Sequence, residues 1–137
     1  MDKLFVILGS SIFVLLGSAH LVMTMFTNKF EARDAQLTED MKRVSPILTR
    51  RTSMWNAWKG FNMSHSLGAI LFGSFFIIVA LENYQYLKTS VALNVVLIIV
   101  PLIFLVLAIK YWFDKPRNGI LVGLSLILLS FAMRIHV

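Results

Sequence analysis

Two histidines inside apolar runs are the residues of this chain best suited to chemistry. His20 lies in a run over residues 4–26, and His65 lies in a second run over about residues 58–81. If the two runs are antiparallel helices, the rise of an α-helix places both imidazoles at one level, roughly 9 to 10 Å deep from the same side of the membrane. Imidazole titrates near neutral pH and ligates most transition metals. Because ionisable groups at membrane depth are costly, the pair predicts either a shared ligand or hydrogen bonds across the helices.

Polar residues near the two histidines complete a candidate pocket. The predicted ligand-binding residues are His20, Arg50, Arg51, Trp58, Asn62, His65 and Ser125. Asn62 and Trp58 share a stripe of the second run with His65, and the serine is expected at a similar level in a later run. The two arginines precede the second run and are available for an anionic group. His20 and His65 are also the candidate metal ligands, although two histidines without a carboxylate form a weak metal signature.

The composition indicates a lipid environment and excludes several kinds of chemistry. Of the 137 residues, 58% are hydrophobic and only 15% are charged, which is not typical of a soluble domain. The chain has no cysteine, so disulfides, thiolate nucleophiles, iron–sulfur clusters and thiolate zinc sites are excluded. The net charge of +6 lies mostly beside the apolar runs. It therefore indicates orientation in a membrane, and no nucleic-acid partner is expected.

Four apolar runs are long enough to cross a bilayer as helices, over about residues 4–26, 58–81, 91–113 and 119–135. The sequence therefore predicts an all-α integral membrane bundle of four transmembrane helices, forming a single membrane domain over residues 1–137. Ten Lys and Arg side chains fall on one side of the membrane and three on the other. By the positive-inside rule, both termini of this multi-pass protein of the cell (inner) membrane are expected to be non-cytoplasmic.

The cytoplasmic connection over residues 27–57 carries a helical pattern of its own. Its apolar residues recur at helical spacing, namely Phe30, Leu37, Met41, Val44 and Leu48. Thr38 followed by two acids predicts a helix N-cap, and Pro46 predicts the helix end near Ser45. Such an amphipathic helix either lies in the headgroup layer or folds over the cytoplasmic mouth of the bundle. Its mixed charges favour the second interpretation.

Small residues at a spacing of four predict where helices approach one another closely, since a small side chain lets two backbones meet. Gly119 and Gly123 form such a pair in the fourth run. Ser64 and Gly68 form another in the second run. The pattern predicts tight packing, either within the chain or between copies of it.

Two charged residues lie at the ends of runs on the predicted non-cytoplasmic side, namely Glu82 and Arg134. They either form an ion pair or reach separately into the headgroups, and for Arg134 the headgroups are favoured. The third histidine, His136, is assigned to the tail, which leaves two histidines at membrane depth.

Part of this pattern resembles a known kind of protein. The chain is similar to a family of small four-span bacterial membrane proteins without an assigned activity, in the motif W-x4-GFN-x-SHS-x-G from Trp55 to Gly68 and in Gly17 and His20. The resemblance implies a compact bundle in a bacterial membrane and no particular reaction. In size and number of spans alone, the chain also resembles the quinone-linked DoxX-like four-helix membrane proteins.

These observations predict a small polytopic membrane protein that is not an enzyme and needs no cofactor. It is expected to act as a homo-oligomer or as a subunit of a larger membrane complex. A polar pocket between the first two spans would bind a lipid- or quinone-like amphipathic ligand. One alternative is a membrane redox protein with one haem b held by His20 and His65. A lower alternative is a membrane enzyme for glutathione-like or lipid substrates, whose turnover would depend on Arg50 or Arg51.

Overall fold

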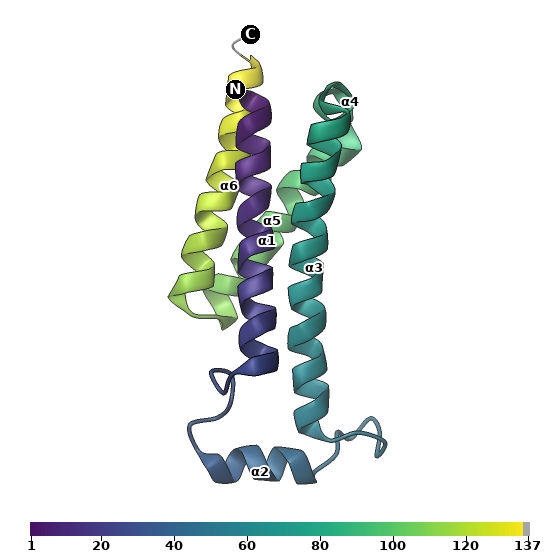
Figure 1. Ribbon diagram of the computed structural model, residues 1–137, viewed down its shortest axis with the longest axis vertical. Coiled ribbons are helices and arrows are strands. Elements are labelled where there is room, and N and C mark those ends of the chain that lie inside the picture. The colour runs from purple at the N-terminus through teal and green to yellow at the C-terminus, as the bar shows by residue number, and fades with distance from the viewer. Residues whose placement is uncertain (136–137) are drawn as a thin grey trace. The chain divides into compact units, whose positions relative to one another are not determined.

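The computed structural model describes residues 1–135, with side chains described up to Arg134, so His136 falls outside the described residues. Over this range the chain is helical and has no strand (Figure 1). Its elements are α1 (Asp2–Phe26), α2 (Ala35–Arg43), α3 (Met54–Glu82), α4 (Tyr84–Thr89), α5 (Val91–Tyr111) and α6 (Asp114–Ile135). By length and composition α1, α3, α5 and α6 can each cross a membrane, which confirms the predicted all-α fold with four membrane-spanning helices.

Apolar runs predict the presence of these helices better than they predict their ends. α3 begins at Met54, before the apolar run, because the polar stretch from Trp55 to Lys59 is helical as well. α6 begins at Asp114, where an acid in the first turn suits the helix dipole and pairs with Arg117 at 3.0 Å. An apolar run thus indicates the part of a helix that suits lipid, while the helix itself extends beyond it.

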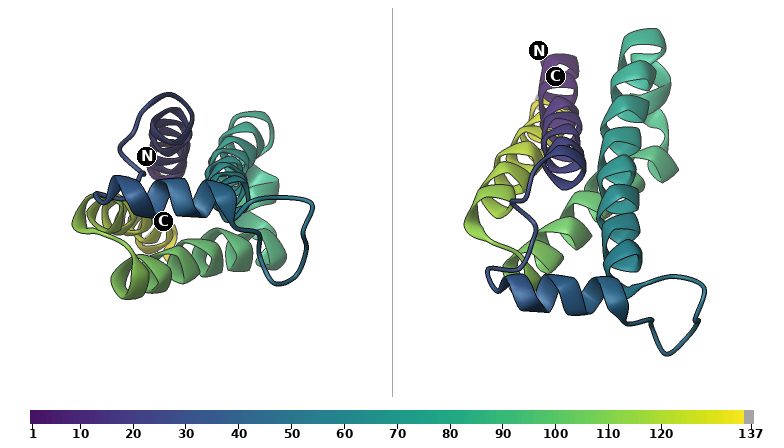
Figure 2. Two further views of the ribbon diagram at one scale, coloured as in Figure 1. Left: turned by 90° about the horizontal axis from the view of Figure 1, so that it is seen from below. Right: turned by 60° about the horizontal axis from the view of Figure 1, so that its bottom comes forward.

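α2 begins one turn earlier than predicted. Its N-cap is Asp34, whose carboxylate accepts a hydrogen bond from the Gln36 amide at 2.9 Å. The prediction that Thr38 caps the helix is wrong, because Asp34 already caps the first turn and Thr38 is buried within the helix. The helix ends at Arg43, before Pro46, as expected. α2 lies across the ends of α1 and α3 and not alongside them (Figures 1 and 2).

The short connection between α3 and α5 contains a helix, α4, that the sequence pattern does not indicate. Asn83 caps it by accepting a hydrogen bond from the Tyr86 amide at 3.0 Å. Ser90 ends α4 and caps α5, since its hydroxyl accepts from the Leu93 amide at 3.3 Å. A helix of 6 residues is too short to show a recognisable apolar period.

The contacts of the chain divide it into two compact units, the first made of Met1–Leu16 with Ala69–Val137 and the second of Gly17–Gly68. The boundary cuts through α1 and α3, so both helices contribute to both units. The single membrane domain stays a prediction. The buried hydrophobic core lies in the first unit, while the predicted site residues, apart from Ser125, lie in the second.

Glycines in the first unit bring α1 against two other helices. A Cβ placed on Gly9 would lie 2.8 Å from the Gly123 carbonyl oxygen, and one placed on Gly73 would overlap the Ser10 carbonyl oxygen. Neither position has room for a methyl group, so α1 meets α6 and α3 backbone to backbone. Phe13 is buried beside these contacts and packs edge-to-face on aromatic rings of α3 and α5.

The predicted close approach at Gly119 and Gly123 is confirmed, since a Cβ on either would lie tightly against α1. Gly68 makes no close approach within the described chain, because a Cβ placed there meets no atom of it within 4 Å, so a contact between copies at Gly68 stays a prediction. The close approach made by α3 falls at Gly73 instead. Five residues turn a helix face by about 140°, so Gly68 and Gly73 cannot face the same neighbour.

Arg134 turns inward at the end of α6, so the prediction that it reaches into the headgroups is wrong. Its Nη1 donates to Asn94 Oδ1 at 3.0 Å, and its guanidinium lies over the rings of Phe131 at 4.4 Å and Tyr84 at 5.6 Å. Burial raises the pKa of Tyr84, whose hydroxyl therefore stays neutral beside this cation. Glu82 is exposed and forms no ion pair with Arg134. An amide oxygen and two ring faces hold the cation in place of a carboxylate.

Replacing Gly73 by alanine is expected to destabilise the protein, because the new methyl group would force α1 and α3 apart. Overpacking of this kind costs about 1–3 kcal/mol. The free energy of unfolding, measured by denaturant titration in detergent micelles, should fall by that amount. Gly68→Ala on the same helix is the matched control and should leave stability unchanged or slightly raised, since a methyl group there meets nothing in the described chain. Equal losses in the two variants would contradict the close approach.

Candidate functional site

The second unit brings three of the predicted residues together, and we call His20, Asn62 and His65 the imidazole layer. His20 projects from α1 and Asn62 from α3, and Nε2 of the imidazole lies 3.1 Å from Oδ1 of the amide. His65 lies further along α3 and packs its ring edge-to-face on that of His20, with 5.7 Å between the ring centroids. All three side chains are half-buried.

The hydrogen bonds of Asn62 indicate which ring nitrogen of His20 carries the proton. Nδ2 of Asn62 donates to the Trp58 carbonyl at 2.9 Å, which turns Oδ1 of the same amide toward the imidazole. An amide oxygen can only accept, so Nε2 of His20 carries the proton and donates it. The backbone carbonyl of His20 accepts from the Thr24 hydroxyl at 2.8 Å, and that of Asn62 accepts from the Ser66 hydroxyl at 2.8 Å. Asn62 therefore joins α3 to α1 through Oδ1, while Nδ2 bonds to a carbonyl of its own helix.

This arrangement does not fit the haem that His20 and His65 would hold in the redox alternative. Ligation of iron through Nε2 of His20 would break its hydrogen bond to Asn62. A porphyrin would also need a flat slot beside the imidazole, where Phe30 packs with 4.4 Å between ring centroids. Among residues 1–135, no group of three or more His, Asp or Glu side chains could hold a metal ion.

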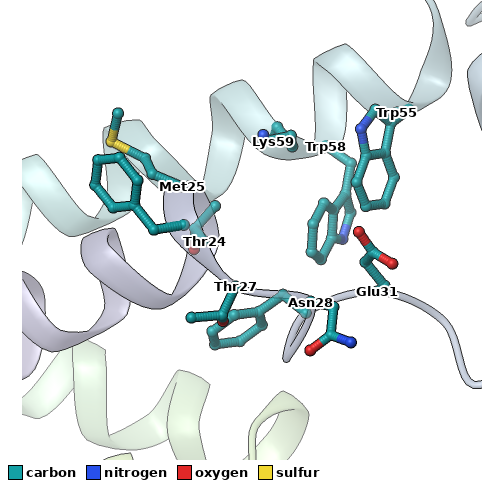
Figure 3. A pocket seen from close by; sticks show the side chains of 10 residues that line it. Thr24, Met25, Thr27, Asn28, Glu31, Trp55, Trp58 and Lys59 are labelled. Atoms are coloured by element: carbon teal, nitrogen blue, oxygen red, sulfur yellow. The ribbon is translucent and has the colours of Figure 1, made fainter.

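A cavity of about 220 Å³ adjoins the imidazole layer at the ends of α1 and α3 (Figure 3). It is lined by Thr24, Met25, Phe26, Thr27, Asn28, Phe30, Glu31, Trp55, Trp58 and Lys59. Three of these residues also contact the imidazole layer, since Phe30 packs on His20, the Thr24 hydroxyl donates to the His20 carbonyl, and the Trp58 carbonyl accepts from Asn62. The imidazole layer therefore lies behind the cavity wall and supports it.

The cavity lining combines opposite charges with aromatic faces. Trp55 and Trp58 stack with 5.4 Å between ring centroids and 18° between ring planes. Lys59 follows them on α3 and is half-buried, while the carboxylate of Glu31 lies beside the indole rings (Figure 3). An anionic group can bind at the lysine ammonium, and a cationic group can bind between the carboxylate and the indole faces.

Of the predicted residues outside the imidazole layer, Trp58 lines this cavity and the other three do not. The imidazole layer adjoins it. Arg50 and Arg51 are exposed between α2 and α3 and are absent from the lining. Ser125 lies on an exposed face of α6, in the first unit, and its role in binding stays a prediction.

Most of the cavity lining was not predicted from the sequence. The predicted helical pattern included Phe30, but the structure places Phe30 and Glu31 in the irregular segment before α2, where a helical period does not determine which way a side chain points. One signal was present on α3, because Trp55, Trp58 and Lys59 recur at helical spacing on one face. That spacing is typical of an interfacial helix end and does not by itself indicate a cavity.

Comparisons of the chain with protein-family models, with curated proteins and with solved structures find no match. The resemblances to a small four-span bacterial family and to DoxX-like proteins therefore stay predictions.

We expect His20 and Asn62 to be energetically coupled, because replacing either one leaves a polar group of the other unpaired. Side-chain hydrogen bonds between membrane helices average about 0.6 kcal/mol and reach about 1.7. A double-mutant cycle of His20→Phe and Asn62→Leu, measured as the free energy of unfolding in micelles, should give a coupling in that range. The control cycle combines His20→Phe with Ser64→Ala, because the Ser64 hydroxyl bonds only to its own helix at the Phe61 carbonyl. Coupling no larger than in the control would rule out the bond as a link between the helices.

Proposed function

We propose that this chain is a membrane protein without catalytic activity that binds the headgroup of a lipid- or quinone-like amphipathic molecule in the cavity of the second unit. The observation that supports the proposal is the cavity lining, which is apolar and aromatic on one part and charged on another. The cavity lies at the ends of two helices that are long and apolar enough to cross a membrane. A ligand with a polar head and an apolar tail matches both features.

The cavity walls favour entry of the ligand from the bilayer. Tryptophan is enriched at the level of the headgroups, and Trp55 and Trp58 both line the cavity. Met25 and Phe26 line it as well and are exposed. An apolar tail can therefore lie over these two side chains in lipid while the head occupies the cavity.

Among amphipathic ligands, a lipid whose headgroup carries both charges fits the lining better than a quinone does. A quinone carbonyl needs a donor, but the N–H of His20 is already given to Asn62. A phosphate can accept from Lys59, and an ammonium group can lie on the indole faces with Glu31 beside it. We therefore favour a zwitterionic phospholipid headgroup, with a quinone-like ligand as the alternative.

The imidazole layer has a positioning role in this proposal. His20 contacts Phe30, and Asn62 holds the carbonyl of Trp58, so both set the place of aromatic wall residues. The enzyme alternative has less support, because Arg50 and Arg51, which would bind its substrate, do not line the cavity. By the positive-inside rule, the cavity opens on the cytoplasmic side of the cell membrane. The protein would act there as a homo-oligomer or as a subunit of a larger membrane complex.

Native mass spectrometry tests this proposal on the full chain in nanodiscs that contain phosphatidylethanolamine, phosphatidylglycerol and a quinone. The protein should retain phosphatidylethanolamine. Lys59→Ala and Glu31→Gln should each lower its occupancy by about tenfold, the effect of losing about 1.4 kcal/mol of binding free energy.

Two exposed charges outside the cavity lining provide matched controls, Lys110→Ala and Glu39→Gln, and both should leave occupancy unchanged. Retention of the quinone, insensitive to Glu31→Gln, would favour the quinone-like alternative. Retention of no amphipathic molecule, or equal occupancy in all four variants, would contradict the headgroup site.

A further inference from the structure

The segment between α2 and α3 presents the most exposed large apolar side chains that the structure describes outside the four membrane-length helices. Ile47 and Leu48 are neighbours with exposed fractions of 109% and 94%. Adjacent apolar side chains exposed to this degree indicate an interaction surface. Neither residue lines the cavity, so the proposed function does not account for them.

Hydrogen bonds hold this segment in a defined shape. The Met54 amide donates to the Val44 carbonyl at 2.8 Å, which joins the two ends of the segment. The Thr49 amide donates to the Pro46 carbonyl at 3.2 Å, which closes a turn with Ile47 and Leu48 at its two central positions. We call residues 44–53 the basic loop. Its apolar pair is therefore displayed at the tip of a closed turn.

The basic loop also carries cations that have no carboxylate partner. The two cations just before it, Lys42 and Arg43, are ion-paired with acids of α2 at 2.7 and 2.8 Å. Arg50 and Arg51 follow the apolar pair, and among the described residues no carboxylate lies within ion-pair distance of either. The sequence has no acid between positions 40 and 82, so the charge of this surface is positive.

We propose that the basic loop is an interfacial anchor for an anionic bilayer surface. Ile47 and Leu48 insert among the upper acyl chains, while Arg50 and Arg51 bind lipid phosphates. An apolar pair beside two cations complements the headgroup layer, which is apolar on its inner side and negative at its surface. The loop projects to the side of the first turn of α3 (Figures 1 and 2). That turn holds Trp55, a residue type enriched at the level of the headgroups, so the loop lies where headgroups are expected.

A single labelled cysteine tests this anchor, because the chain has no cysteine of its own. Leu48→Cys, labelled with an environment-sensitive fluorophore, is placed in nanodiscs of phosphatidylcholine with or without phosphatidylglycerol. The emission should shift to the blue and be quenched by spin-labelled lipid, more strongly in the anionic discs. Gln36→Cys, at an exposed position of α2, is the matched control and should keep an aqueous emission.

The charge requirement is tested in the same discs. Arg50→Gln combined with Arg51→Gln should lower the lipid quenching of the Leu48 probe in anionic discs to its level in neutral discs. Salt at about 1 M should do the same, because it shortens the Debye length to about 3 Å. A Leu48 probe that stays accessible to aqueous iodide in both kinds of disc would overturn the proposal. Protection that appears only on adding polyglutamate would overturn it too, in favour of an acidic protein partner.

Discussion

A polar group held at membrane depth must find its partner inside the protein, because lipid offers none, and this constraint shapes both helices of the candidate site. The hydroxyl groups of Ser11, Thr24 and Ser66 bond back to carbonyls of their own helices. His20 and Asn62 instead satisfy each other across two helices, and the same amide also donates to the Trp58 carbonyl. The Asn62 amide and the Nε2 proton of His20 are therefore already used in hydrogen bonds within the protein. Of the cavity charges, Glu31 lies in the irregular segment between α1 and α2, and Lys59 lies in the second turn of α3.

The two units meet their packing needs in different ways. In the first unit, glycines such as Gly9 and Gly73 bring backbones together. Aromatic rings that pack edge-to-face on Phe13 fill the core. Arg134 is held in the same unit by an amide and two ring faces. In the second unit, aromatic rings line a cavity in place of a filled core. The proposed binding role thus falls to the unit that holds the cavity, while the buried hydrophobic core lies in the other unit.

The sequence predicts the long helices well because an apolar run of that length has no stable form in lipid other than a helix. It predicts details less well where local hydrogen bonds compete. Asp34 caps α2 in place of Thr38, and Asn83 caps the short helix α4, which no apolar period predicts. Small residues show the same limit. Within the described chain, Gly123 makes a close helix contact and Gly68 does not, since helix rotation, and not spacing alone, selects the contact face.

The sequence by itself determined four membrane-length helices and a common level for His20 and His65, because helical rise and apolar length are local properties. Only the tertiary structure decided that the proton of His20 is donated to Asn62, and that the site beside this pair is a cavity with Glu31 in its wall. Both outcomes depend on how two helices are rotated about their axes and on the path of an irregular segment. Contacts between residues far apart in the chain select these, and no local period encodes them.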